Sequence, residues 1–165
     1  QVLQIDRTIP SVPKNLIPSA VIVPIILQPE NPRILFIRRS ENTSHHKNQV
    51  SFPGGKFDPE TDDFLKNTAL REMKEEVGVK VKPKEILGVF SDPNRDPRGR
   101  VISTAFICEF EGKPTAGSDA GAIKQCTVED ALSLDLAFDH TLIVTCYKRW
   151  IEKRGTFWSQ KSLNH

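Results

Sequence analysis

The feature that most constrains the fold is an amphipathic segment with a clear helical period. It lies within GGKFDPETDDFLKNTALREMKEEVGV, residues 54–79. Its apolar residues recur at the spacing that one buried face of a helix requires; they are Phe64, Leu65, Ala69, Leu70, Met73 and Val77. Asp62 or Asp63 is the predicted N-cap, and Gly78 is the predicted C-terminal cap. The sequence therefore predicts a helix that ends at about Val77.

Three glutamates, Glu72, Glu75 and Glu76, crowd into the last turns of this predicted helix. Their spacing places them on one face, where each like-charge pair costs roughly 0.2–0.5 kcal/mol. The helix dipole at this end favours cations over anions by about 0.3–1 kcal/mol each. Two interpretations remain open. The glutamates form a solvated acidic face relieved by Arg71 and Lys74, or they bind a hard divalent cation that also takes phosphate oxygens as ligands.

The remaining segments predict a mixed α/β (α+β) fold with two main helices. Turn residues in QPENP separate two runs of β-branched and aromatic residues, which predicts a β-hairpin. Mostly antiparallel strands are expected at 19–26, 33–39, 79–82, 85–91 and 100–110, with a short strand in 50–57, a short helix at 127–136 and a long helix at 138–155. Residues 1–18 are expected to form an N-terminal arm and 19–165 a single domain.

Composition argues against several classes of partner. The chain has 165 residues, enough for one packed domain, and its net charge of +2 comes from scattered basic residues. No nucleic-acid partner is therefore expected. The longest apolar run, AVIVPIIL at 20–27, is too short to span a bilayer. The three cysteines are widely spaced and form no zinc or disulfide pattern, so we expect a cytoplasmic protein. Because the apolar run is short, no membrane partner is expected.

A family resemblance enters at ALREMKEEVGV. This segment resembles the core of the Nudix box, G-x5-E-x7-R-E-U-x-E-E-x-G-U with U aliphatic, and FPGGK resembles its usual entry. The matching positions are Arg71, Glu72, Met73, Glu75, Glu76, Gly78 and Val79. Fifteen residues separate Gly55 from Arg71, whereas the motif has thirteen. The first glutamate of the motif therefore matches Glu60 from one side and Asp63 from the other.

The resemblance implies a Nudix-type α/β/α sandwich with a mixed β-sheet. It also implies hydrolysis of a nucleoside diphosphate linked to another moiety, with Mg²⁺ or Mn²⁺ as cofactor. Carried over by position, Glu72, Glu75, Glu76 and the carbonyl of Gly55 are the expected metal ligands. Arg71 is expected to orient a glutamate through a salt bridge. The carboxylate that accepts the proton of the attacking water is expected to be Glu76 or Asp119, and both stay open.

Two further segments resemble different branches of the family. SDPNRDPRGRVISTAFI (residues 91–107), AGSDAGAIK and LAFDH resemble microbial ADP-ribose pyrophosphatases. In the first of these, Arg95 and Arg98 could clamp phosphate oxygens, while Asp92 and Asp96 could accept ribose hydroxyls or brace the arginines. PSAVIVPIIL and the lengthened box resemble coenzyme A pyrophosphatases, whose upstream pattern Arg39, Ser40 and 52–55 fit, including Phe52.

ADP-ribose is the expected substrate and coenzyme A the runner-up. Ser44 and Asn48 stand where the coenzyme A pattern has Arg and Gly, although His45, His46 and Lys47 could compensate. A third reading, from another class, is a sensor domain that binds ADP-ribose without hydrolysing it. The partner is in each case a small-molecule nucleotide, and a homodimer is possible. Phe90 and Phe138 are candidates for contact with adenine, with a buried core position as the alternative for each.

Overall fold

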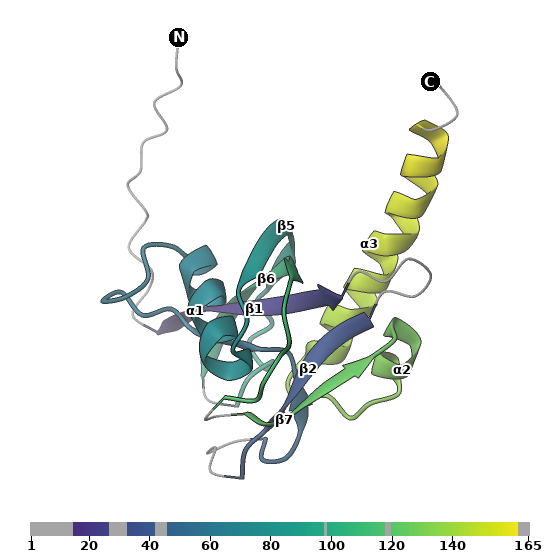
Figure 1. Ribbon diagram of the computed structural model, residues 1–165. Helices are drawn as coiled ribbons and strands as arrows, with labels where there is room; N and C mark the ends of the chain where they lie inside the picture. Colours follow the sequence, from purple (N-terminus) through teal and green to yellow (C-terminus); the bar gives the residue numbers. More distant parts are fainter. Residues whose placement is uncertain (1–14, 27–32, 42–45, 98, 118–119, 162–165) are drawn as a thin grey trace.

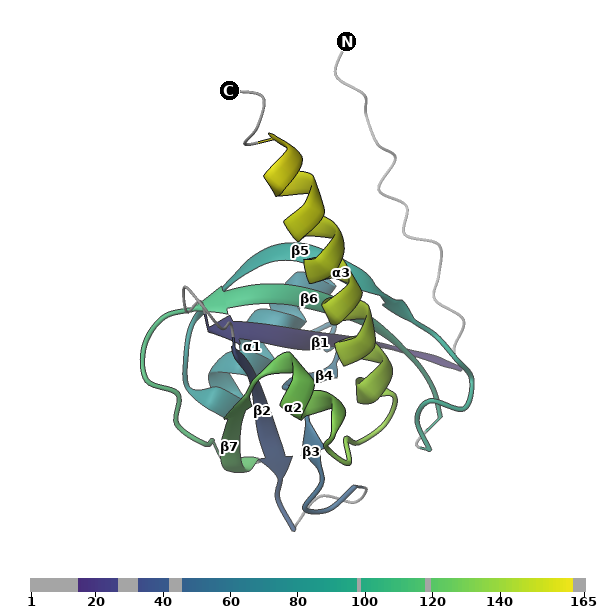
Figure 2. The ribbon, with the colours of Figure 1, turned by 90° about the vertical axis from the view of Figure 1, so that its right-hand side faces the viewer.

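The chain folds as a layered structure with a central β-sheet. The computed structural model describes residues 15–26, 33–41, 46–97, 99–117 and 120–161. Its elements are β1 (Leu16–Ile26), β2 (Arg33–Arg39), β3 (Val50–Ser51), β4 (Gly54–Lys56), α1 (Leu65–Val77), β5 (Val81–Phe90), β6 (Arg100–Phe110), β7 (Ala120–Cys126), α2 (Val128–Leu132) and α3 (His140–Lys161). Figures 1 and 2 show α1 and α3 on opposite sides of the sheet.

The sheet is mixed, as the sequence predicts. Its strand order is β3-β2-β1-β6-β5, with β4 also paired to β1 and β7 paired to β2. β1 and β6 run parallel, and the other strand pairs are antiparallel. The predicted hairpin is confirmed, because Ile25 of β1 lies opposite Ile34 of β2. The expected arm at 1–18 can be followed only from residue 15, since residues 1–14 lie outside the described part of the chain.

β1 separates two hydrophobic cores. Successive side chains of a strand point to opposite faces. Val21 and Val23 accordingly pack in one cluster with residues of α2 and α3, including Tyr147. Ala20 and Ile22 pack in a second cluster with residues of α1, including Met73. The sheet is therefore covered on both faces, which gives three layers.

Helix α1 confirms most of the predicted period. Ala69, Met73 and Val77 are buried against the sheet. Gly78 ends the helix in the left-handed conformation at φ 72°, and its N–H donates to the carbonyl of Lys74. The N–H groups of Thr115 and Gly117 donate to the carbonyls of Val77 and Glu76 at 2.9 Å each. The loop after β6 thus satisfies carbonyls that the helix leaves unpaired at its end.

The start of α1 differs from the prediction. The N-cap is Phe64, without a side-chain hydrogen bond to the helix, and its ring is 60% exposed instead of buried. Neither Asp62 nor Asp63 caps the helix, because the chain remains irregular up to Phe64. The carboxylate of Asp62 is bound elsewhere, as described below. The prediction of an acidic N-cap is therefore wrong.

Three other elements also differ from expectation. A single strand, β5, replaces the two strands expected at 79–82 and 85–91, with irregular pairing around Pro83 and between Ile86 and Gly88. β7 was not expected, because its AGAIKQC sequence has little apolar alternation. Helix α3 continues to Lys161, beyond the expected end at 155. None of the described helices combines the length and apolar character needed to cross a membrane.

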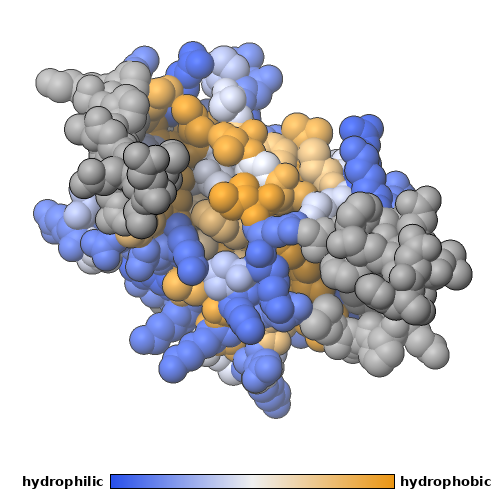
Figure 3. Space-filling view, turned by 90° about the horizontal axis from the view of Figure 1, so that it is seen from above, coloured by the Kyte–Doolittle hydropathy of each residue, from blue (hydrophilic) through white to orange (hydrophobic). Residues whose placement is uncertain are grey.

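β5 leaves apolar side chains on the surface. It is the last strand of the sheet order, and the side chains of Ile86 and Val89 are about three-fifths exposed. Figure 3 shows apolar atoms gathered on the upper face of the molecule, the side on which β5 lies in Figure 1. Patches of this kind commonly contact other proteins. The homodimer that the sequence analysis names as possible is not tested by this surface.

Gly78→Ala should destabilise the fold by about 1–2 kcal/mol, because an alanine at this φ is strained. Its Cβ would also lie 2.7 Å from the hydroxyl oxygen of Thr115. Gly88→Ala is the matched control, since its Cβ would meet only the Phe90 ring, at 3.6 Å and 3.8 Å. We expect the control to stay within about 0.5 kcal/mol. Urea unfolding of the three proteins measures both changes, and equal losses for the two variants would contradict the role of Gly78.

Candidate functional site

The acidic face of α1 lies against the two glycines of β4. A Cβ on Gly55 would clash with the carboxylate of Glu72, so in this arrangement the carboxylate packs directly on the glycine backbone. The N–H of Gly54 donates to Oε2 of Glu76 at 3.0 Å. β4 is held in place by pairing with Ala20 and Val21 of β1. Two of the three glutamates are therefore fixed next to one short strand.

Arg71 contacts the other side of this acidic face. Its Nη1 donates to Oε1 of Glu72 at 2.7 Å and to Oε2 of Glu75 at 3.3 Å. Its Nη2 donates to the carbonyl of Lys56 in β4 at 3.1 Å. The guanidinium thus lowers the repulsion between the glutamates and links the helix to the glycine strand.

The remaining edge of Arg71 binds Asp62, whose carboxylate is almost fully buried. Nε of Arg71 donates to Oδ1 at 3.1 Å and Nη2 donates to Oδ2 at 2.9 Å. The Thr68 hydroxyl and the Asp58 N–H also donate to Oδ2. The hydrogen bond from Arg71, chiefly, lowers the pKa of Asp62 from 3.8 to about 2.

The lengthened box leaves two candidates for the first glutamate of the motif, and the structure shows a third acidic residue, Asp62, paired with Arg71. The two acidic residues aligned with the first glutamate of the motif, Glu60 and Asp63, are both exposed. It is Asp62, between them, that pairs with Arg71. Sequence spacing could not single it out, because the segment before α1 contains several acidic residues and no period to rank them.

The predicted metal ligands have the right chemistry but do not converge. Among the described residues, no three histidine, cysteine, aspartate or glutamate side chains gather around one point. Arg71 holds Glu72 and Glu75, while Glu76 binds the Gly54 amide. Burial raises the pKa of Glu72, and the charge of Arg71 opposes that rise. An oxygen-only donor set suits a hard cation, and Arg71 contacts one carboxylate oxygen of Glu72 and one of Glu75.

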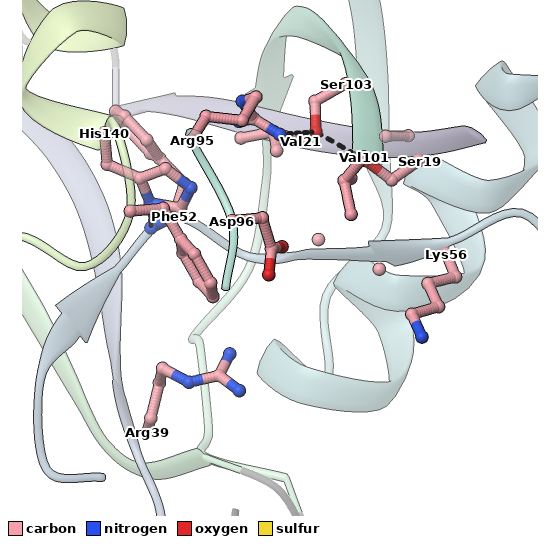
Figure 4. Close-up of a pocket in the computed structure, with 14 residues that line it drawn as sticks. Ser19, Val21, Arg39, Phe52, Lys56, Arg95, Asp96, Val101, Ser103 and His140 are labelled. Atoms are coloured by element: carbon pink, nitrogen blue, oxygen red, sulfur yellow. Dashed lines mark hydrogen bonds between the residues drawn. The ribbon is translucent and has the colours of Figure 1, made fainter. Parts of the chain in front are cut away.

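A pocket opens beside the glycine strand and extends toward β2 and the start of α3. It is lined by Ser19, Ala20, Val21, Arg39, Phe52, Gly54, Gly55, Lys56, Arg95, Asp96, Val101, Ser103, Phe138 and His140. Figure 4 shows Asp96 projecting between Arg39 on one side and Lys56 on the other. The enclosed part of the pocket measures about 50 Å³. That volume holds a water or two and no nucleotide, so a larger ligand must lie across the open mouth.

Arg95 braces the wall of this pocket. Its Nε and Nη2 donate to the two carboxylate oxygens of Asp139 at 2.8 Å and 2.6 Å, and Nη1 donates to the Ser103 hydroxyl at 2.6 Å. Only 3% of its side chain is exposed. These contacts use the fork of the guanidinium within the protein, so they do not favour the predicted phosphate clamp. The bracing carboxylate is Asp139, which sequence analysis did not select.

The other predicted substrate residues fall into three groups. Arg39, Phe52 and the buried Asp96 line the pocket. Asp92 is exposed and does not line it; its Oδ1 accepts the N–H of Asn94 within a turn. Arg98 and Asp119 lie outside the described residues.

Of the two aromatic candidates for an adenine contact, only one reaches the pocket. Phe90 packs in the hydrophobic core that contains α3. Phe138, in contrast, lines the pocket wall. The two outcomes fit their positions in the chain, since Phe90 ends a strand and Phe138 lies in the turn before α3.

His140, at the start of α3, is a further pocket residue that sequence analysis did not select. Its Nδ1 accepts the N–H of Phe52 at 2.9 Å, so a neutral ring carries its proton on Nε2. Burial, followed by the charges of Arg95 and Arg39, lowers the pKa of His140 from 6.5 to about 3. The imidazole is therefore neutral near pH 7. Lys56 was missed as well, and only its position directly after the Gly-Gly pair could have pointed to it.

Asp62→Asn should destabilise the protein by about 2–3 kcal/mol, because it leaves the charge of Arg71 without its buried partner. Asp63→Asn and Glu60→Gln change exposed carboxylates and should each stay within about 0.5 kcal/mol. Chemical unfolding at pH 7 measures all three. Equal losses for Asp62→Asn and Asp63→Asn would contradict the assignment.

His140 should make stability fall with acid. The folded pKa of about 3 lies below the ordinary value of 6.5, so the contribution is complete above pH 6.5 and is lost as the pH falls toward 3. Within that window the unfolded chain binds one more proton, and the free energy of unfolding should fall by about 1.4 kcal/mol per pH unit.

His140→Asn keeps an acceptor for the Phe52 N–H and removes the titration, so it serves as the control. Urea unfolding between pH 6 and pH 4.5 should give a shallower pH dependence for this variant than for the wild type. This window lies above the pKa range of Asp62, which therefore does not contribute. Parallel pH dependences would rule out a neutral His140 in the folded state.

Comparisons with known proteins agree with this architecture. A NUDIX domain model matches residues 17–145. An ADP-ribose pyrophosphatase from Methanocaldococcus jannaschii is 41% identical over 133 residues, which cover 79% of this chain and 74% of that protein. The Yersinia enterocolitica protein described as an uncharacterized Nudix hydrolase NudL is 47% identical over 70 residues, and the match spans about a third of its length, 35%, and 42% of this chain.

Solved structures show the same fold. The NUDIX domain of Shewanella oneidensis NrtR, cocrystallised with ADP ribose, gives a TM-score of 0.73 at 21% identity, with coverage of 86% of this chain and 92% of that one. A MutT/nudix family protein from Enterococcus faecalis gives a TM-score of 0.69 at 24% identity, with coverage of 86% and 64%. The predicted Nudix-type sandwich is thus confirmed. With a family match over most of its length and a relative of 41% identity, the chain belongs to the Nudix family of pyrophosphohydrolases.

Proposed function

We propose that this pyrophosphohydrolase acts on ADP-ribose, releasing AMP and ribose 5-phosphate, and that it requires Mg²⁺ or Mn²⁺. The observation that carries the proposal is the position of the acidic face of α1. Glu72 and Glu76 lie against Gly54 and Gly55, and both glycines line a pocket whose mouth also carries Arg39 and Lys56. Carboxylates and cations thus meet at one opening, as the diphosphate of a nucleotide requires.

Each group has a defined part in the proposed reaction. A divalent ion held by Glu72, Glu75, Glu76 and the Gly55 carbonyl would neutralise the diphosphate and lower the pKa of a bound water. Arg71, fixed by Asp62, sets the orientation of the glutamates. Arg39 and Lys56 bind phosphate oxygens across the mouth.

The proton acceptor is proposed to be Glu76 or Asp119. Glu76 is buried, and its carboxylate is held by the Gly54 amide. Asp119 lies outside the described residues, but Gly117, two residues earlier in sequence, donates its N–H to the carbonyl of Glu76. The chain up to Gly117 is therefore anchored at the end of α1, which supports keeping both candidates.

ADP-ribose comes first because of two relatives. The Methanocaldococcus protein is described as an ADP-ribose pyrophosphatase, and the NrtR domain was crystallised with ADP ribose. Coenzyme A is the second candidate, favoured by the contact between His46 and Phe138, whose ring centroids lie 4.3 Å apart. This contact brings the loop with His46 and Lys47 to the pocket edge, where it could bind a further phosphate.

AMP release from ADP-ribose with Mg²⁺ tests the proposal, with coenzyme A at equal concentration as the competing substrate. We expect preference for ADP-ribose, loss of AMP release with EDTA, and recovery with excess Mg²⁺ or Mn²⁺. Faster release of 4′-phosphopantetheine from coenzyme A would favour the second candidate. ADP-ribose binding without hydrolysis under both metals would favour a sensor and contradict the proposal.

Glu76→Gln is the matched inactive variant for the same assay. Its amide can still accept the Gly54 N–H, so the fold should persist while kcat/KM falls by about 100-fold or more. Lys74→Gln changes an exposed residue on the same helix and should leave kcat/KM within about twofold. Activity of Glu76→Gln within about threefold of the wild type would contradict the metal-ligand assignment.

A further inference from the structure

Phe138 has a backbone conformation that a bulky residue rarely adopts. Its φ is +57°, in the left-handed region. Such a conformation costs about 1–2 kcal/mol in an L-residue other than glycine and persists only where the surroundings enforce it. The flanking residues do so here, because Ala137 donates its N–H to the carbonyl of Val50 and His140 donates its N–H to the carbonyl of Ala137. The strain lies in a residue that lines the pocket.

The Phe138 ring is clamped by rings from two other positions. Its centroid lies 4.3 Å from that of His46 and 5.4 Å from that of His140. His140 is itself fixed by the Phe52 N–H and by contact with the Phe52 ring, which packs on Phe36 in the sheet. A continuous series of five rings therefore runs from the core to the pocket edge.

The loop that supplies His46 is also unusual. His46 and Asn48 both have positive φ, at 55° and 60°. A chain of hydrogen bonds orients the His46 ring, since Nδ1 pairs with Oε1 of Gln49 and Nε2 of Gln49 donates to Asp135. Asparagine and histidine adopt this conformation more readily than a bulky residue such as phenylalanine, for which it is an outlier. Two residues with positive φ, from distant segments, thus meet in one ring contact.

The guanidinium of Arg39 lies over the Phe138 ring. Its Cζ is 5.5 Å from the ring centroid, within the range of a cation–π interaction. The pairing of β2 with β7 shifts between Arg38 and Arg39, and such an irregularity turns a side chain away from the regular direction. The side chain of Arg39 therefore turns to the point where it meets Phe138, and both residues line the pocket.

From this arrangement we propose that Phe138 is a positioning residue, which holds the Arg39 guanidinium at the pocket wall where Arg39 binds the diphosphate of the substrate. Phe138 itself contacts no reacting atom. The inference rests on the proposed function, because it takes the nucleoside diphosphate as ligand. It gives a functional reason for strained backbone at a residue that lines the pocket.

The test is a double-mutant cycle on the KM for ADP-ribose. Phe138→Leu should raise KM by about fivefold and leave kcat within about twofold, since it removes the ring face but no reacting group. Arg39→Met should raise KM by about tenfold or more. In the double variant KM should match that of Arg39→Met alone, because Phe138 acts through Arg39.

Phe138→Tyr keeps the ring face and should keep the wild-type KM within about twofold. If Phe138→Leu does not fold, Phe138→Asn replaces it, because asparagine tolerates the left-handed conformation while lacking the ring. Thermal unfolding checks that each variant is folded. An unchanged KM in the variants without the ring, an effect on kcat instead, or single effects that multiply in the double variant would each overturn the proposal.

Failure of this inference can be separated from failure of the proposed function. Hydrolysis of ADP-ribose combined with independent effects of Phe138 and Arg39 would remove only the inference. If wild-type protein binds ADP-ribose without hydrolysing it, the proposed function fails. The double-mutant cycle of Phe138 and Arg39 is then measured with Kd values for ADP-ribose from calorimetry. The two fall together if ADP-ribose does not bind.

Discussion

The ion pair between Asp62 and Arg71 is the contact on which the candidate site most depends. A buried carboxylate without a partner is costly, and Asp62 is stable only because Arg71, Thr68 and the Asp58 amide bind it. Arg71 in turn reaches Glu72, Glu75 and the carbonyl of Lys56. One guanidinium therefore ties the irregular segment before α1, the acidic face and the glycine strand into a single unit.

The sheet places the two sides of the site, the glycine strand and the wall with Ser103, on strands that both pair with β1. β1 pairs with β4 on one side and with β6 on the other, so the glycines near α1 and the wall with Ser103 share one support. Arg95, which precedes β6 in the chain, then connects Ser103 of β6 to Asp139 in the turn before α3. The pocket is thus enclosed by parts of the chain that are distant in sequence, and Arg95 in its wall is held by contacts within the protein.

Local sequence patterns predicted the elements that are determined by residues close together in the chain. The period of α1 and the glycine after it predicted the buried face and the end of the helix, and the turn in QPENP predicted the hairpin. β7 escaped prediction because only its two end residues, Ala120 and Cys126, are buried, so its pairing with β2 defines it instead of an alternating pattern. The N-cap was assigned wrongly because the tertiary contact with Arg71 competes for Asp62.

The site was predictable in type and less so in detail. The glutamates and glycines of the box share one short segment, so a motif could indicate them. The contact of Arg95 with Asp139 spans 44 positions, and that of His140 with Phe52 spans 88. No local period records such pairs, because they form only when the sheet has brought the segments together.

The anchored loop after β6 limits where the chain can tolerate inserted residues. Thr115 and Gly117 are bound to the last carbonyls of α1, and a Cβ on Gly117 would lie far too close to the carbonyl oxygen of Glu75. An insertion between these two positions would pull on the helix turn that carries Glu75 and Glu76. Additional length, or a fused tag, is better accommodated at Gly112, where a side chain would meet no atom within 4 Å.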